Sequence, residues 1–393
     1  MSIQDNVFLN HAAVVCAGGN SLAQLKRCLL DRQADVMTWT EEFGTTALPV
    51  GKCQGELTAI PLEGPQWQSR NNQIALAVYE QICEQVAEAV QQYGANRVGV
   101  VIGTSTSGIG DAEPAIKHYV ETGALPKEYH YSVQEMANTA EFVAELAGVT
   151  GPVYAISTAC SSGAKALISA KRLISSGLCD VVIAGGVDSL CKLTLQGFSA
   201  LEAVSDEVCL PFSVNRRGIN IGEGGALFVV SKQREGVRLA GMGESSDAHH
   251  ISAPEPEGKG AEQAMQQALQ DAGLNPSEID YINLHGTATS LNDQMESLAV
   301  SRVFPATIMC SSTKPFTGHT LGAAGAIEAA ICWLALTEAG FVPPHCWDGQ
   351  ADPALPALNF VAAQARNTTI NRAISNSFAF GGNNVALVME SVR

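Results

Sequence analysis

The amino-acid sequence predicts a layered α/β protein built from two similar halves. Short apolar segments alternate along the 393 residues with longer segments of helical character, an alternation typical of α/β folds. The apolar segments are continuous, which indicates strands covered on both faces, as in a sheet between layers of helices. The length is large for one compact core and suits two packed parts.

Each element is predicted from its composition. Buried strands are expected at residues 97–102, 153–156, 181–184, 226–230, 281–284 and 385–389. Helices are expected at residues 73–92, 163–176, 260–272 and 323–337. The last of these has a single charged residue, Glu328, so we expect a helix buried on all sides. A charged run near residues 231–236 divides the chain into an N-terminal half, residues 1–233, and a C-terminal half, residues 234–393.

The composition argues against several classes of protein. A formal net charge of −16 disfavours a general affinity for nucleic acid or for an anionic membrane. The 11 cysteines show no regular spacing and no Cys-x-x-Cys pair, which disfavours a disulfide scaffold or a zinc module. The sequence shows neither a signal peptide nor an apolar run long enough to span a membrane, so a cytoplasmic protein is expected.

Cys160 is the candidate nucleophile. It follows the strand at 153–156 in a turn of small residues, and a helix is expected to begin at Gly163. The positive end of a helix dipole favours the thiolate, which is the reactive form of cysteine. The alternative is a buried cysteine that acts as a small apolar side chain.

Two of the eight histidines stand at the ends of predicted elements. His285 follows the strand at 281–284, and His319 precedes the apolar helix at 323–337, positions from which a side chain can reach a pocket. With Cys160 they could be scattered structural residues, a cysteine hydrolase site or a site that binds a carbonyl group. Surface or packing roles are expected for His11, His118, His130 and His345, and no metal site is expected at the adjacent His249 and His250.

Four blocks of the sequence resemble the signature motifs of the β-ketoacyl-acyl carrier protein synthases, in the elongating Cys-His-His branch. The blocks are Thr-Ala-Cys-Ser-Ser-Gly at 158–163, His-Gly-Thr-Ala-Thr-Ser-Leu-Asn-Asp at 285–293, Lys314 with Gly-His-Thr-Leu-Gly-Ala-Ala-Gly at 318–325, and Asn-Ser-Phe-Ala-Phe-Gly-Gly-Asn-Asn at 376–384. The resemblance implies a thiolase-like fold. In that fold the two halves pack into five α-β-α-β-α layers, with the active site between them.

The same resemblance implies a decarboxylative Claisen condensation. An acyl group carried by Cys160 would react with malonyl-acyl carrier protein to give β-ketoacyl-acyl carrier protein, without a metal or a cofactor. Neutral imidazoles of His285 and His319 would donate hydrogen bonds to the thioester oxygen as the enolate forms. The backbone N–H groups of Cys160 and Phe380 would form the oxyanion hole.

Further residues receive roles from the resemblance. Lys314 and Glu328 would form a buried ion pair that orients His319 and tunes the local charge. The positions that hold the pantetheine arm fall on Thr287 and Thr289, and those that gate the acyl pocket fall on Phe198 and Phe380. For Asp293 and Glu296, at the expected start of a helix, a structural role is predicted.

One segment departs from the family pattern. The usual Pro-Phe-Asp-x-x-Arg-Asp-Gly reads Pro-Phe-Ser-Val-Asn-Arg-Arg-Gly at residues 211–218. Arg216 and Arg217 are therefore expected to make the entrance more basic and to bind an acidic carrier protein. Together with other departures, this change favours a polyketide or aryl polyene-type pathway over primary fatty acid synthesis.

The resemblance also implies a homodimer, or a heterodimer with a related subunit. Two other functions remain open beside the condensing enzyme. A non-catalytic partner of the chain-length-factor type would lack the reactive cysteine, whereas Cys160 is present. A thiolase acting on coenzyme A esters would carry a second cysteine in a Cys-x-Gly motif near the C-terminus, and the last glycine-rich motif has none.

Overall fold

The computed structural model describes residues 6–31, 35–44, 46–362 and 368–392. Eleven strands form one mixed sheet in the order β11-β10-β9-β12-β13-β8-β1-β7-β6-β4-β5. Their bounds are β1 (Phe8–Cys16), β4 (Val98–Gly103), β5 (Val153–Ile156), β6 (Val181–Asp188), β7 (Gly224–Ser231), β8 (Val237–Ser246), β9 (Tyr281–Asn283), β10 (Met309–Ser311), β11 (Asn359–Phe360), β12 (Arg372–Phe378) and β13 (Asn383–Ser391). A separate hairpin joins β2 (Thr38–Thr40) and β3 (Leu48–Val50).

The large sheet repeats one arrangement in the two halves of the chain. In the first half, β4 runs parallel to β5 and β6, and β7 runs antiparallel to β6 and β1. In the second half, β9 runs parallel to β10 and β12, and β13 runs antiparallel to β12 and β8. The halves join where Phe8 and Leu9 of β1 pair with β8. The predicted α/β fold with two similar halves is confirmed.

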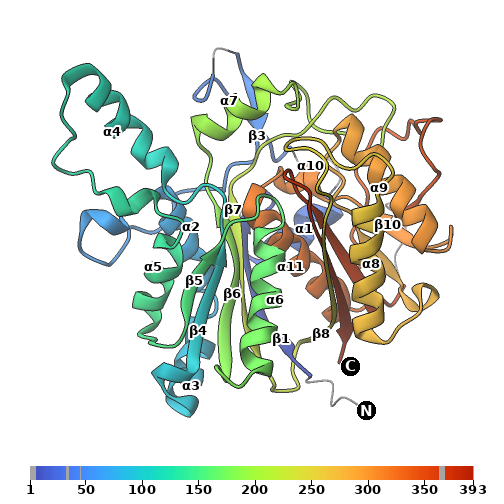
Figure 1. The fold of residues 1–393 in the computed structure, drawn as a ribbon, viewed down its shortest axis with the longest axis horizontal. Coiled ribbons are helices and arrows are strands. Elements are labelled where there is room, and N and C mark those ends of the chain that lie inside the picture. Colours follow the sequence, from blue (N-terminus) through green and yellow to red (C-terminus); the bar gives the residue numbers. More distant parts are fainter. Residues whose placement is uncertain (1–5, 32–34, 45, 363–367, 393) are drawn as a thin grey trace.

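Helices form three further layers. The central layer is α6 (Ser162–Ser175) with α11 (Ala324–Thr337), and both helices contact strands from each half (Figure 1). The first half is covered on its outer face by α2 (Arg70–Tyr79), α3 (Cys83–Tyr93) and α5 (Asn138–Ala147), and the second by α8 (Lys259–Ala272) and α9 (Ser290–Val303). The remaining α-helices are α1 (Leu22–Leu30), α4 (Ile109–Thr122), α7 (Lys192–Ala200) and α10 (Lys314–Thr317).

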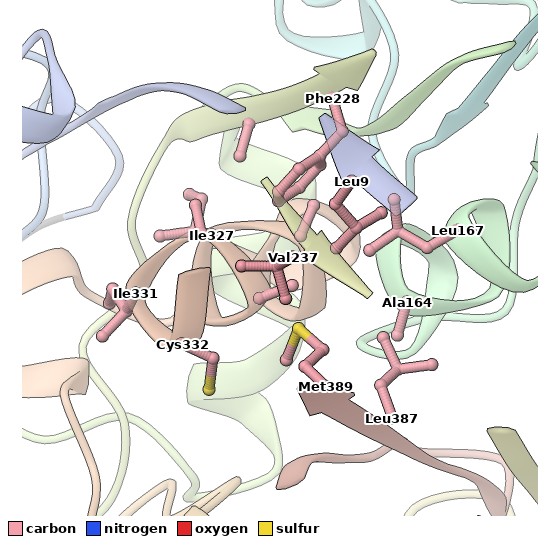
Figure 2. Packing of buried hydrophobic residues seen from close by; sticks show 14 of the residues in the cluster. Leu9, Ala164, Leu167, Phe228, Val237, Ile327, Ile331, Cys332, Leu387 and Met389 are labelled. Atoms are coloured by element: carbon pink, nitrogen blue, oxygen red, sulfur yellow. The ribbon is translucent and has the colours of Figure 1, made fainter. Parts of the chain in front are cut away.

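The core around α11 joins the two halves. Figure 2 shows Ile327, Ile331 and Cys332 of this helix close to side chains from strands of both halves, among them Phe228 and Met389. Each large aliphatic side chain buried here stabilises the fold by about 1.5–3 kcal/mol. The predicted helix at 323–337 is thus confirmed as a buried helix, because all but two of its residues are buried.

Two predictions about elements were wrong or incomplete. The single helix expected at 73–92 is two helices, because a turn with the Ile82 N–H donating to the Tyr79 carbonyl separates α2 from α3. The short strands β2, β3, β10 and β11 were not predicted, and neither were the longer strands β1, β8 and β12. Polar residues or glycines interrupt all three, and the glycines of β8, Gly241 and Gly243, lie against the backbone of α8. Within the described ranges, no helix is both long and apolar enough to cross a bilayer.

Candidate active site

The structure brings Cys160, His285 and His319 together at the centre of the molecule. Cys160 lies in the turn between β5 and α6, His285 follows β9, and His319 lies between α10 and α11. The Cys160 Sγ atom is 3.0 Å from Nε2 of His319, and the two imidazole ring centroids are 5.4 Å apart. One ligand atom from each residue lies within 4.8 Å of the others, and all three side chains are buried.

The backbone beside each of these residues is strained. Ala159 before Cys160, Ala288 after His285 and Leu321 after His319 have φ angles of 51°, 63° and 50°. A non-glycine residue in this left-handed region costs about 1–2 kcal/mol. Helix α6 also packs closely against the segment that precedes α11. A Cβ atom added to Gly163 of α6 would lie only 2.9 Å from the carbonyl oxygen of Gly322 in that segment. The surrounding core therefore holds three strained turns in place at one point.

The buried setting of the Cys160 thiol opposes the thiolate that the sequence predicts. Burial raises its pKa to about 11, and the nearby charge of Lys314 opposes this rise only in part. Desolvation is the largest cause of the raised pKa, and it acts against the stabilisation of the thiolate expected from the helix N-terminus. The sulfur needs a proton acceptor, and His319 is within hydrogen-bonding distance.

Both imidazoles are neutral, as expected from the sequence. Burial and the charge of Lys314 hold the pKa of His285 and of His319 well below the usual value. Within the described residues the Nδ1 atom of each ring is buried without a hydrogen-bond partner. Two uncharged rings are thus available to hydrogen-bond a developing negative charge without protonating it.

Lys314 forms a buried ion pair with Glu328, but it supports a different histidine from the one predicted. Its ammonium group contacts the Glu328 carboxylate and donates to the backbone carbonyl oxygen of His285 at 2.5 Å. The contact we expected with His319 is therefore made with the backbone of His285. Burial raises the pKa of Glu328 to about 7, and the charge of Lys314 opposes this rise.

Two buried acids hold the loop that carries His285. The Glu296 carboxylate accepts hydrogen bonds from the N–H groups of His285 and Gly286, each at 2.8 Å. Asp293 accepts from the N–H groups of Phe212 and Ala288 at 2.7 and 3.2 Å. These acids therefore have the predicted structural role. They exert it by accepting hydrogen bonds from backbone N–H groups of loops, in addition to any effect on the start of α9.

A third buried acid, Asp188, was missed by the sequence analysis. It ends β6 and accepts hydrogen bonds from Thr104, from the N–H groups of Ser105 and Thr106, and from the N–H of Gly322 at 2.5 Å. It thus ties the loop after β4 to the turn that follows His319. A single acid at the end of an apolar strand, 134 residues from Gly322, was the only available signal.

The three residues open onto a cavity of about 340 Å³. Its lining includes the two predicted gate residues, Phe198 and Phe380. The ring centroids of these two residues are 5.2 Å apart. It also includes Thr287 and Thr289, whose hydroxyl oxygens are 2.9 Å apart. The Phe380 N–H is directed at the Cys160 sulfur, so an oxygen bound next to that sulfur would meet this donor.

The two arginines at the cavity do not make it basic as predicted. Arg216 is 8% exposed and is paired with Asp352 at 2.6 Å. Arg217 is 58% exposed, but it lies 3.5 Å from Asp206 and 3.4 Å from Glu207. The charge of Arg216 is therefore neutralised by a buried ion pair, and the charge of Arg217 is balanced by the neighbouring carboxylates.

No other cluster of histidine, cysteine and acidic residues within the described ranges is close enough to hold a metal ion. A cation bound to Cys160, His285 and His319 would be opposed by the ammonium group of Lys314, whose charge acts on all three. The arrangement suits chemistry on a thioester, with a sulfur nucleophile, a proton acceptor and hydrogen-bond donors for an oxygen.

Comparisons with known proteins agree with this chemistry. Residues 51–235 match the family model "Beta-ketoacyl synthase, N-terminal domain" and residues 237–346 match "Beta-ketoacyl synthase, C-terminal domain". Nodulation protein E of Rhizobium meliloti is 34% identical over 81% of this chain and 82% of its own length. The 3-oxoacyl-[acyl-carrier-protein] synthase 2 of Staphylococcus aureus is 33% identical over 82% of this chain and 81% of its own length.

Solved structures give the same result. A chain in the complex of a ketosynthase with its chain length factor from Xenorhabdus doucetiae has a TM-score of 0.93 and is 40% identical, with 98% of each chain covered. A chain of a type II PKS acyl-carrier protein in complex with its ketosynthase has a TM-score of 0.87 at 26% identity, covering 98% of this chain and 99% of that one.

Proposed function

Because the chain belongs to the beta-ketoacyl synthase family, we propose that it condenses an acyl group on Cys160 with malonyl-acyl carrier protein. The observation that carries this proposal is the meeting of one thiol and two neutral imidazoles at the end of a single cavity. The reaction needs no metal and no cofactor, since both substrates are thioesters on the pantetheine arm of the carrier.

The first step transfers the acyl group to Cys160. His319 accepts the proton of the thiol as the sulfur attacks the acyl thioester, and the proton then passes to the departing thiol of the carrier. The 3.0 Å distance between Sγ and Nε2 supports this role. The bond from the acyl carbon to the carrier sulfur breaks and the bond to Cys160 forms. The negative oxygen of the intermediate is stabilised by the Phe380 N–H.

The second step forms the carbon–carbon bond. Malonyl thioester loses carbon dioxide, and the electron pair left behind forms an enolate, whose oxygen accepts hydrogen bonds from the ring N–H groups of His285 and His319. For His319 this step uses the tautomer with the proton on Nε2, whereas the tautomer with the proton on Nδ1 accepts the thiol proton in the first step. The enolate carbon attacks the acyl carbonyl, the bond to Cys160 breaks, and the sulfur takes a proton from solvent. Thr287 and Thr289 bind the arm, and Phe198 and Phe380 separate the acyl group from the entrance, in accordance with their places in the cavity lining.

We propose that the protein works as a dimer with a second subunit of the same fold. Strand β5 is the last strand of the described sheet, so one of its edges has no neighbouring strand within this chain. Helix α4 projects from the body (Figure 1) and exposes Ile116, Tyr119 and Val120 by 47, 52 and 78%. An unpaired strand edge and a group of exposed apolar side chains are each typical of an interface.

The subunit partner is either a second copy or a related chain. The complexes of ketosynthases with chain length factors among the similar structures favour a related chain, with the present chain as the subunit that retains the cysteine. They also favour polyketide or aryl polyene-type synthesis over primary fatty acid synthesis. Native mass spectrometry of the chain alone distinguishes these cases. A stable homodimer would contradict the need for a related subunit.

Intact-mass analysis tests the reaction. The protein is mixed with a panel of acyl carrier thioesters and then with malonyl carrier protein. We expect the acyl mass on the wild type and its absence on Cys160→Ala, followed by loss of that mass and formation of β-ketoacyl carrier when malonyl carrier is added. Removal of the nucleophile lowers turnover by about 10⁴-fold or more. An acyl mass on Cys160→Ala, or no β-ketoacyl product from the wild type, would contradict the proposal.

A further inference from the structure

The mouth of the catalytic cavity carries no excess of positive charge. Its charged lining residues are Glu202, Asp247, Arg216 and Arg217. The ion pair with Asp352 neutralises Arg216, and Asp206 and Glu207 flank Arg217. The residues that line this mouth therefore offer an acidic partner no excess of positive charge, and the formal charge of −16 on the whole chain adds no attraction at longer range.

Large apolar side chains are exposed at the same mouth. Leu201 and Leu291 line the cavity and are 54 and 55% exposed. Ile251 is 81% exposed, and its carbonyl oxygen accepts a hydrogen bond from the Gly381 N–H at 2.8 Å, directly after Phe380. We call these three residues the apolar rim. Apolar side chains grouped around a functional opening mark a surface that another protein covers.

We propose that the apolar rim is the docking surface for the acyl carrier protein, and that docking depends on apolar contact instead of charge attraction. This inference rests on the proposed function. Cys160 is buried and lines the same cavity as the exposed Leu201 and Leu291, so a thioester on a tethered arm reaches it only with the carrier held at the opening of this cavity. The carrier therefore presents an apolar surface beside the attachment point of its arm.

The rim is tested with Ile251→Ser and Leu291→Ser. The matched control is Leu178→Ser, because Leu178 is 58% exposed in the turn after α6, roughly 20 Å from the Cys160 end of that helix. For each protein, kcat/KM is measured with malonyl carrier protein and with a malonyl N-acetylcysteamine thioester, which has no carrier. We expect each rim variant to lower the ratio of the two values about tenfold, and the control to leave it unchanged.

Salt dependence gives a second measurement. We expect the KM for the carrier to stay constant or fall between 50 and 500 mM sodium chloride, and Arg217→Glu to change it less than about twofold. The inference is overturned by a steep rise of KM with salt, by unchanged ratios in both rim variants, or by an altered oligomeric state in those variants, which would identify the rim as a subunit interface.

The affinity of Cys160→Ala for fluorescently labelled carrier separates this inference from the proposed reaction. Tighter binding to a protein with the rim intact than to the same protein with Ile251→Ser supports the rim, even if no condensation occurs. Equal binding overturns the rim, even if condensation is observed.

Discussion

The two central helices occupy equivalent places in the two halves, but they carry charge in different ways. Helix α6, which begins beside Cys160, places Lys165 and Arg172 near the surface, where both pair with Glu244 of β8 at 3.6 and 2.5 Å. Helix α11 carries only Glu328, which is buried with Lys314 directly beneath the histidines. Charge on the surface side of α6 can therefore vary at little cost, whereas the buried charge beside α11 couples the chemistry to the stability of the fold.

The largest expected effect is the loss of stability caused by the substitution Lys314→Met. The substitution leaves Glu328 buried without its partner, which lowers the free energy of unfolding by about 3–5 kcal/mol near neutral pH. Urea denaturation measures this loss, and Glu328→Gln in the same background should restore part of it. Equal losses in the single and double variants would show that the pair does not couple the two residues.

The free energy of unfolding of Lys314→Met should also depend on pH. Burial already raises the pKa of Glu328 to about 7 against the opposing charge of Lys314, so loss of that charge raises the pKa further. Between the unfolded value and this raised value, the unfolded state loses its proton while the folded state keeps it. The stability of Lys314→Met should therefore fall as pH rises above about 4.5, and the loss should be smaller at pH 5.5 than at pH 8.

The next prediction distinguishes the catalytic steps that depend on His285 and on His319. His319 contacts the sulfur, whereas His285 is held from behind by Glu296 and Lys314. His285→Ala should load Cys160 at nearly the wild-type rate and slow condensation by about 10²–10³-fold, since it removes one donor to the enolate. His319→Ala should slow both steps. Rapid-quench mass analysis measures loading, and product formation measures condensation. Slow loading in His285→Ala would contradict this division.

Residues placed by local motifs could be predicted from the sequence, whereas contacts between distant segments could not. Cys160, His285 and His319 lie in short motifs next to strands or helices, so their places in the fold could be predicted. Asp352, which pairs with Arg216, lies 136 residues from it, and Gly322, one of the partners of Asp188, lies 134 residues away. No local pattern indicates such pairs. The helix at 73–92 failed for the opposite reason, because its apolar spacing continues through the turn that contains Ile82.

The thiol pKa shows a further limit of the sequence. A cysteine before a helix predicts a thiolate, but the degree of desolvation depends on the packing of α6 against α11. With a pKa of about 11, alkylation of Cys160 by iodoacetamide should accelerate about tenfold per pH unit from pH 7 to 10. The modified cysteine is identified by peptide mass analysis. A plateau below pH 8 would indicate a thiolate stabilised by the helix, and would remove this difference between expectation and structure.

The smallest expected effect is the loss of stability on removing the surface ion pairs of α6. Glu244→Gln removes the partner of Lys165 and Arg172, and Arg172 is 62% exposed. We expect a loss of only about 0.2–1 kcal/mol in the free energy of unfolding, diminished by salt, with unchanged condensation. Glu121→Gln on α4, which removes the exposed pair with Lys117, is the matched control. A loss above about 2 kcal/mol for Glu244→Gln would mean that charge on α6 supports the fold as strongly as the buried pair of α11, and the contrast between the two helices would fail.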